Sequence, residues 1–403
     1  MCDHHHPPRF SRRRLFASLI PGAILAQQPQ PQTVEQTAAL FRQRSADFEK
    51  RGLTDPFKGI TANGEVERGL FPVFSTGVPT TTVREAAVRF LGTLSAEQKQ
   101  RTMFEVDDPE WRKWMNQHFY RRQGVSLKEL NGGQRDAAFG LLQAALSPRG
   151  VKLTRDIMRL NEVLADLSGD HDFLGEWEYH ITVMGKPSQV EPWGFQFDGH
   201  HCIINYFILG DQVVMTPYFV GSEPVTARGI SILQEEQNRG LAMLLALDKG
   251  QQAKAVLNPA KTDNYNLTEA FKDNVVLDYA GLRADAMSAK QKKQLLDLIL
   301  LYVGNMDDGH AKVKMQEVRK HLDNTYFAWI GGTEQGGVFY YRIHSPVILI
   351  EFDHQRPANL RHLAKDPNQP NPQHIHCVVR TPNGNDYGKD LLRLHYAQSK
   401  HGD

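Results

Sequence analysis

The stretch AAVRFLGTLSAEQKQRTMF (residues 86–104) predicts the end of one helix, a turn, and a second helix opened by the capping pattern Ser95-x-x-Gln98. A similar arrangement recurs at RGLAMLLALDKGQQAKAVL (residues 239–257), where Gln251 stands in the place of Gln98. Recurrence on this scale indicates an internal repeat. The two stretches therefore predict that the chain consists of two related halves.

Both predicted halves continue with the same kinds of elements. A Gly-led segment with one apolar helical face follows in each, at 124–146 and at 281–303. Each half then turns to strands and reaches a Thr-Pro pair. The strand segments are 176–208 and 325–353, and the Thr-Pro segments are VVMTP (213–217) and VVRTP (378–382).

This order of elements predicts an α+β fold of internally duplicated helix-helix-antiparallel-strand units, arranged with pseudo-twofold symmetry. The strands of the two halves are expected to join across the pseudo-twofold axis and so form one composite domain. Four segments are expected: an export signal at 1–26, an N-terminal helix with a wrapping segment at 27–84, a first half at 85–237, and a second half at 238–403.

The N-terminus, MCDHHHPPRFSRRRLFASLIPGAILA (residues 1–26), has basic residues up to Arg14 and then a short apolar stretch. This stretch is too short to cross a bilayer, so the pattern predicts an export signal. SRRRLF (11–16) resembles a twin-arginine signal, whose pathway carries folded proteins; a general secretory signal and a basic disordered tail are the alternatives. We expect a periplasmic or extracellular protein, and we exclude the three histidines of the leader as ligands.

The composition bears on the classes of partner. The 403 residues include 47 Lys and Arg against 46 Asp and Glu, so no basic surplus predicts a nucleic-acid partner. No second long apolar run predicts a membrane span in the mature chain. Cys202 and Cys377 either form one disulfide or serve as small buried hydrophobes in strands. A small-molecule substrate is the expected partner, and the oligomeric state stays open.

Positions at which the two halves differ are candidates for a functional site. FDGHHCIINY (197–206) carries a His-His pair where the second half has Ser-Pro-Val at 345–347. Conversely, the second half has His-Ile-His at 374–376 where the first has Leu-Gly-Asp at 209–211. Each half therefore contributes histidines that the other lacks.

Alternation along a strand selects among these histidines. His374 and His376 stand two residues apart, so both side chains are expected on one face. If the cysteine-bearing faces of both strands pack into a core, His201 and Asn205 lie on the same face as this pair. His200 then falls on the cysteine side, towards packing, although it is kept among the candidate metal ligands.

Three imidazoles, with or without a carboxylate, suit zinc, iron or copper. His201, His374 and His376 are the expected ligands of one such transition metal ion. Glu351, which the duplication matches to an asparagine of the first half, is expected to act as a fourth ligand or as a general base. His395 near the C-terminus is a further pocket candidate. The alternative is a buried network of His, Asn and Glu that holds two sheets together.

Arginine and aromatic side chains near the last strands complete the candidate pocket. Arg342, the second candidate catalytic residue, or Arg380 could hold an anionic substrate group through a planar guanidinium. A salt bridge to one of the two carboxylates of the strand segment EFD (351–353) is the alternative. Tyr387 follows the last strand, and Trp193 either lines a pocket or packs in a core.

Several motifs in combination resemble a known family. They are PWGFQFDGHH (192–201), TPYFVGSEP (216–224), LQEEQ (233–237), YYRI (340–343), HIHCVVRTPNGNDYG (374–388) and LLRLHY (391–396). Together they resemble the bacterial family known as domain of unknown function 3500, over nearly all of the mature chain. The resemblance implies no established activity. The chain departs from the family pattern at Ser345-Pro346, where Gly-Pro is common.

These observations lead to three hypotheses. The first is an exported metal-dependent hydrolase of unknown substrate with a His-rich mononuclear site. The second is a metal-dependent oxidoreductase, in which iron or copper occupies the same site. The third is an exported binding protein without catalysis, whose histidines belong to a structural His, Asn and Glu network.

Overall fold

The computed structural model describes residues 33–334 and 336–398 of the chain. The predicted export signal, with its three histidines, lies outside the described residues.

The described strands form one sheet of 13 strands and a separate two-stranded ribbon. The main path across the sheet runs β1 (Met103–Phe104), β3 (Tyr179–Met184), β4 (Trp193–Gly199), β5 (Cys202–Leu209), β7 (Tyr218–Ser222), β15 (Ile375–Arg380), β14 (Leu349–His354), β13 (Phe339–His344), β12 (Tyr326–Gly331) and β10 (Val256–Asn258). Off this path are β2 (Val125–Ser126), β6 (Gln212–Val214) and β11 (Leu282–Arg283), and the ribbon is β8 (Thr226–Ala227) with β9 (Ile230–Ser231). Among these named strands only β1 with β3 and β10 with β12 pair in parallel.

Ten α-helices accompany the strands within the described residues. They are α1 (Val34–Gly52), α2 (Thr81–Thr93), α3 (Ala96–Thr102), α4 (Gly132–Ala145), α5 (Pro148–Ser168), α6 (Gln234–Leu245), α7 (Lys249–Ala255), α8 (Ala289–Val303), α9 (Asp308–Lys320) and α10 (Lys389–Gln398). The mixture of helices with a mostly antiparallel sheet confirms that part of the predicted fold class.

Glutamine side chains fix the starts of helices in both halves. The predicted capping box of Ser95 and Gln98 is present at the start of α3. Gln98 also accepts a hydrogen bond of 3.0 Å from Gln134 Nε2 at the start of α4. In the second half, Gln251 accepts one of 2.8 Å from Gln291 Nε2, which joins α7 to α8 in the same way.

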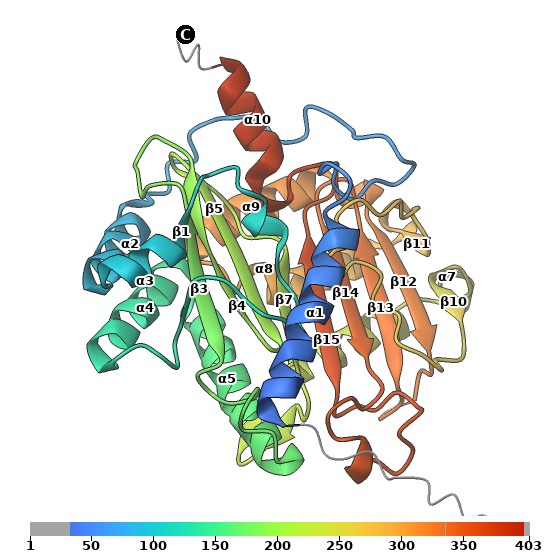
Figure 1. Cartoon of the computed structure of the whole chain (residues 1–403). Coiled ribbons are helices and arrows are strands. Elements are labelled where there is room, and N and C mark those ends of the chain that lie inside the picture. The colour runs from blue at the N-terminus through green and yellow to red at the C-terminus, as the bar shows by residue number, and fades with distance from the viewer. Residues whose placement is uncertain (1–32, 335, 399–403) are drawn as a thin grey trace, which may run out of the picture.

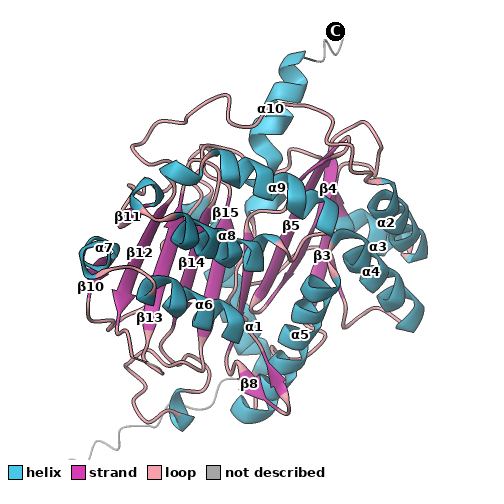
Figure 2. Cartoon of the chain, turned by 180° about the vertical axis from the view of Figure 1, so that it is seen from behind, coloured by secondary structure: helices cyan, strands magenta, loops and turns pink. Residues whose placement is uncertain are grey.

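A helix layer covers one face of the sheet, and Figure 2 shows α5, α6, α8 and α9 across it. Cys202 and Cys377 both belong to the large hydrophobic core between this layer and the sheet. They pair with Val220 of β7 from its two sides, so two strand spacings, about 9.6 Å, separate them. This separation exceeds what a disulfide can bridge, and both cysteines are free. They act as small buried hydrophobes.

The opposite face of the sheet is covered differently. Figure 1 shows α1 crossing the middle strands on this side, with α10 standing at one end of the sheet. A second hydrophobic cluster lies here and includes Ile203, Phe219 and Val378. Because side chains alternate along β15, His376 projects to the same face as Val378. The candidate site therefore lies on the face away from the main helix layer.

The two Thr-Pro segments do not hold equivalent places. The first precedes β7, whereas the second follows β15, and these two strands are antiparallel neighbours. Thr216 Oγ1 and Thr381 Oγ1 therefore meet across the pair and share a hydrogen bond of 2.7 Å. The segment VVMTP is correspondingly not a counterpart of β15, because its short strand β6 pairs with β5.

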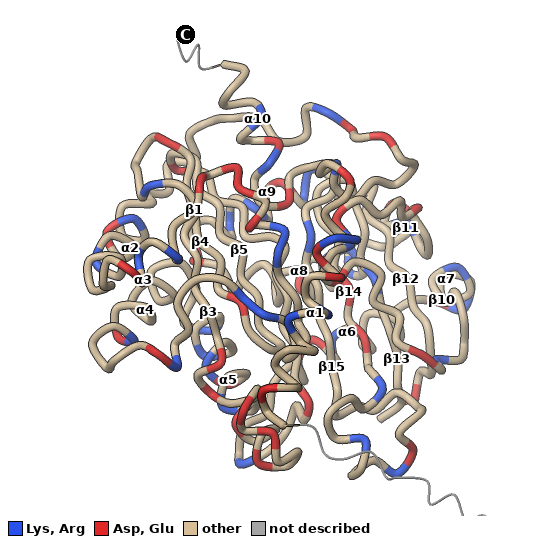
Figure 3. The backbone as a smooth tube through the Cα atoms, viewed as in Figure 1, with Lys and Arg blue, Asp and Glu red and all other residues tan. Residues whose placement is uncertain are grey.

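Charged residues of both signs are spread over both halves of the chain (Figure 3). In the part of the chain that the structure describes, no helix combines the length and the apolar character that crossing a membrane requires.

Candidate metal centre

His200 and His201 form the turn of a hairpin. Gly199 at the end of β4 pairs with Cys202 at the start of β5, so only these two histidines connect the strands. His201 has φ of 65°, in the left-handed region that residues other than glycine rarely adopt. Its N–H donates to Asn116 O (3.3 Å), and its carbonyl accepts from Gly221 N (2.8 Å). The turn, and not strand alternation, therefore decides where the two rings point.

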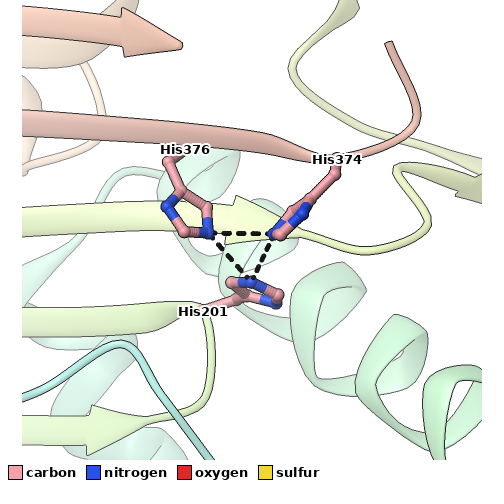
Figure 4. A group of neighbouring side chains, drawn as sticks. All are labelled: His201, His374 and His376. Atoms are coloured by element: carbon pink, nitrogen blue, oxygen red, sulfur yellow. Dashed lines mark hydrogen bonds between the residues drawn. The ribbon is translucent and has the colours of Figure 1, made fainter. Parts of the chain in front are cut away.

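His201 meets the His374 and His376 pair, as the sequence predicts. Its Nε2 lies 3.2 Å from Nε2 of His376 and 3.4 Å from Nε2 of His374, and the latter two atoms are 3.0 Å apart. Figure 4 shows the three rings converging from the hairpin turn and from β15. Two nitrogens bound at about 2.05 Å to one tetrahedral metal lie about 3.3 Å apart. The three nitrogens are thus spaced as ligands of a single ion.

Hydrogen bonds outside the cluster set the tautomers of two of the rings. His374 Nδ1 lies 2.7 Å from the carbonyl oxygen of Arg356, which can only accept. His376 Nδ1 lies 2.7 Å from Glu269 Oε1, which likewise accepts when the carboxylate is ionised. Both Nδ1 atoms therefore carry the hydrogen, and both Nε2 atoms direct a lone pair into the cluster.

Burial disfavours the charged forms of His201 and His376. The exposed fraction is 4% for His201, 4% for His374 and 3% for His376. Burial, followed by the neighbouring histidines, holds the pKa of His201 and of His376 well below the ordinary value of 6.5. The Nε2 lone pairs of His374 and His376 face each other at 3.0 Å and repel unless a cation or a hydrogen-bond donor lies between them. The low pKa values favour a metal cation over a proton.

Two carboxylates that the sequence did not single out support the ligands. Glu269, whose pKa is raised by burial, accepts from His376 and also from Asn266 Nδ2 (2.8 Å). Glu223 Oε1 lies 3.9 Å from His374 Nδ1, and its two oxygens accept backbone N–H groups of the loop at 358–359. Glu223 belongs to the motif TPYFVGSEP, so the sequence contained an indication of this residue. No sequence pattern indicated Glu269.

His200 turns away from the three converging nitrogens. Its Nδ1 lies 2.8 Å from Asn161 Oδ1 on α5, and its carbonyl accepts from Tyr179 O–H (2.8 Å). Its ring packs on that of His201 with centroids 3.8 Å apart. His200 is therefore not one of the converging ligands. Its ring faces α5, on the side of the sheet that parity with Cys202 predicted.

The structure does not bring Glu351 to the three histidines. Its carboxylate accepts hydrogen bonds from the backbone N–H groups of Leu267 and Thr268, from the Thr268 hydroxyl, and from Tyr340 O–H (2.8 Å). The matched residue Asn205 is also fully occupied, because it accepts from Gln196 Nε2 and donates to Pro217 O. These contacts give both residues a structural place and do not support a ligand or base role for Glu351.

The predicted arginines lie in the interior and not in a pocket with the histidines. Arg380 donates to Asp386 (2.7 Å), to Asp273 (2.6 Å) and to Thr268 O (2.8 Å), so it forms salt bridges with partners other than those expected. Tyr387 joins this network by donating to Asp273 (2.9 Å). Arg342 is buried and donates to the carbonyl of residue 278 (3.2 Å).

Trp193 and His395 are remote from the cluster. Trp193 packs in the core on the helix side and donates from Nε1 to Ser188 O. His395 lies on α10, which follows the C-terminal end of β15 and the 386–388 turn. His374 stands at the other end of that strand, about 17 Å away along its axis. Neither residue belongs to the candidate metal centre.

Comparisons with known proteins bear on the family and not on the activity. A search of the curated proteins and a search of the solved structures gave no match. The model of one family, described as "Protein of unknown function (DUF3500)", matches residues 76–389. This span contains every residue of the candidate metal centre, and the chain belongs to the DUF3500 family.

Proposed function

We propose that the protein is an exported metal-dependent enzyme and that its reaction is a hydrolysis. One observation carries the proposal: three buried Nε2 atoms converge, while the Nδ1–H groups of His374 and His376 are accepted by oxygens outside the cluster. Such a set of lone pairs is complementary to a transition metal ion.

In this proposal the residues around the ion have separate roles. His201, His374 and His376 would hold the ion. A zinc ion bound there would supply Lewis-acid chemistry for a hydrolysis. Glu269 orients His376 and makes it a stronger ligand, and the Arg356 carbonyl does the same for His374.

Gly221 adds an independent sign that this space is kept for the rings. A Cβ placed on Gly221 would lie 3.1 Å from His376 Cδ2 and 3.3 Å from His201 Cδ2. It would also lie 2.6 Å from Ile375 O. The closest contact is with the backbone of β15, so a side chain at this position would shift that strand and press on the rings of two of the three proposed ligands.

Metal analysis of protein purified without a His-tag tests the proposal. We expect about one equivalent of transition metal in the wild type and less than about a tenth of an equivalent in His374→Ala and in His376→Ala. His362→Ala, at an exposed position, is the control and should keep its metal. A wild type with no more metal than His374→Ala would refute the metal centre. Iron or copper in place of zinc would turn the proposal towards an oxidoreductase.

Burial of the ligands favours a second candidate, a binding protein without catalysis. The three rings are at most 4% exposed, which suits a structural metal or a buried polar network better than an accessible catalytic ion. In this alternative a metal-loaded protein cleaves none of a panel of ester, amide and phosphodiester substrates. Chelation would nevertheless lower the unfolding temperature, because metal binding contributes to folding.

Export is proposed from the leader alone. The twin-arginine-like segment SRRRLF (11–16) predicts transport of the folded protein. Replacing Arg12 and Arg13 by lysine should retain the protein in the cytoplasm in a fractionation experiment. Unchanged export of this variant would point to the general secretory route.

An internal duplication is likewise proposed. The sheet order runs β3, β4, β5, β7 and then β15, β14, β13, β12, so four of these strands lie on each side of the boundary between β7 and β15. The matching glutamine contacts between helices and the parallel pairs at both ends of the path support the same proposal. An experimental structure in which 85–237 cannot be superposed on 238–398 would contradict it.

A further inference from the structure

A partly open pocket of about 270 Å³ adjoins the candidate metal centre on the far side of His200. His118 and Arg121 line it from the loop before β2, His180 from β3, and His200 from the hairpin turn. The ring of His200 stacks on that of the proposed ligand His201 at 3.8 Å. One wall of the pocket is therefore a single ring away from the metal centre.

Two imidazoles that line this pocket have an unpartnered ring nitrogen. The Nδ1 atoms of His118 and His180 are buried and have no hydrogen-bond partner among the described residues. Burial, followed by the charge of Arg122, lowers the pKa of His118 to about 4 and that of His180 to about 3. Both rings are therefore neutral at pH 7, and each can donate one N–H.

The charge balance of the pocket favours an anion. Arg122 is neutralised by Asp198 (2.8 Å), and Glu178 is paired with Lys128. Arg121 forms no ion pair within the residues that the structure describes, and its guanidinium carbon lies 5.4 Å from the ring centroid of Phe173, another lining residue. The positive charge of Arg121 thus lines the pocket without an ion-pair partner among the described residues.

The structure also holds this loop in place. Phe41 of α1 packs edge-on against His118, with ring centroids 5.6 Å apart. Ser45 Oγ of the same helix accepts from the backbone N–H of Arg121 (3.0 Å). The helix α1 therefore positions the pocket side chains before any ligand binds, which lowers the cost of ordering them.

We propose that this pocket binds the oxyanion of a small anionic substrate, either a carboxylate or a phosphate, through the guanidinium of Arg121 and the imidazole N–H groups of His118 and His180. The role as a substrate site rests on the proposed metal-dependent function, because only the ring of His200 separates the pocket from the proposed ligand His201. The binding of an oxyanion does not depend on the metal. A cation is disfavoured here by the positive charge of Arg121.

Calorimetric titration of the full mature chain with succinate and, separately, with inorganic phosphate tests the proposal. We expect at least one of the two to bind, and Arg121→Gln to weaken that binding by about tenfold or more, since a charge-assisted hydrogen bond is lost. Arg51→Gln is the matched control, because Arg51 is also exposed and stacks on a phenylalanine (4.9 Å) but lies outside the pocket. Its affinity should equal that of the wild type.

The two probes identify the source of the oxyanion: tighter binding of succinate indicates a carboxylate substrate, and tighter binding of phosphate a phosphorylated one. Failure of both probes to bind would overturn the proposal, as would equal affinity of Arg121→Gln and wild type. The same titration of His376→Ala separates this proposal from the metal centre. Binding retained in a variant that holds no metal supports the anion pocket, whereas metal without probe binding refutes the pocket alone.

Discussion

The strand β15 carries a buried polar cluster at each end, and the two clusters balance their charges in different ways. At the C-terminal end, the guanidinium of Arg380 is met by the carboxylates of Asp273 and Asp386. At the N-terminal end, His374 and His376 direct lone pairs towards each other and towards His201. Within the described residues, the guanidinium and the carboxylates of the first cluster satisfy one another, whereas in the second the Nε2 lone pairs of His374 and His376 face each other.

This difference teaches how to separate a structural cluster from a candidate ligand site. Burial alone does not decide, because both clusters are almost fully buried. Residue type does not distinguish the two clusters either, since arginine and histidine both occur in functional sites and in structural cores. What decides is whether the hydrogen-bond donors and acceptors of the cluster satisfy one another.

Arg380→Met should have the largest effect, on stability. The change leaves the buried carboxylate of Asp386 without its cation, which costs about 3–5 kcal/mol of unfolding free energy. Urea denaturation measures it. Arg393→Met is the control, because Arg393 is exposed and its pair with Asp390 (2.9 Å) should contribute less than about 1 kcal/mol. Equal stability of the two variants would break the comparison, since the closed cluster would then not be structural.

Gly221→Ala should have the largest effect at the histidine end. The added Cβ meets the carbonyl oxygen of Ile375 at 2.6 Å, which shifts β15 and with it the ring of His376, and we expect the metal affinity to fall by about a hundredfold. Competition with a chromophoric chelator measures this. Gly140→Ala on α4, where a Cβ meets nothing within 4 Å, should bind metal as the wild type does. An unchanged affinity in Gly221→Ala would show that the rings are not arranged around an ion.

Glu269→Gln should weaken metal binding by a smaller factor, about 10- to 100-fold, because the amide oxygen still accepts from His376 Nδ1 but carries no charge. The same chelator competition gives the number. Glu235→Gln, about half exposed on α6, serves as the control. If Glu269→Gln and Glu235→Gln bind metal with equal affinity, the carboxylate of Glu269 does not strengthen metal binding by His376.

Acid should give the smallest effect and should separate the two ends of β15. The folded-state pKa of His376 is lowered below its unfolded value of 6.5, so its stabilising contribution is present above pH 6.5 and is lost as the pH falls. Arg380 has a raised pKa and does not titrate in this range. In metal-free protein, the stability advantage of wild type over His376→Gln should shrink by at most about 1.4 kcal/mol per pH unit below 6.5. Urea denaturation at pH 7, 6 and 5 measures it, and a constant difference would contradict the assignment.

Much of the fold followed from local patterns in the sequence. Capping residues, apolar helical faces and alternating strands predicted a mixed fold with mostly antiparallel strands, and the structure contains these elements. The predicted match between the two Thr-Pro segments was wrong. The similar residues belong to the short strand β6 in one half and to the central strand β15 in the other. Pairing partners, which lie far apart in the sequence, decide such cases.

The structure brings the three selected histidines together, but the reason used to select them holds only in part. Strand alternation placed His201 with His374 and His376, yet His201 stands in a two-residue turn with φ of 65°. Glu351 was assigned to the site because its strand position matched Asn205. Its carboxylate instead bonds a loop that includes Leu267 and Thr268, and strand position carries no information about that loop.

The sequence by itself determined the three candidate ligands, the element types and the family, because these depend on residue identity and short spacings. The tertiary structure alone decided that Nε2 atoms from residues 201, 374 and 376 converge, that Glu269 supports one of them, and that Arg121 faces a pocket beside His200. The physical reason is that hydrogen-bond partners and charge neighbours are set by chain segments more than a hundred residues apart, which only the packed sheet brings together.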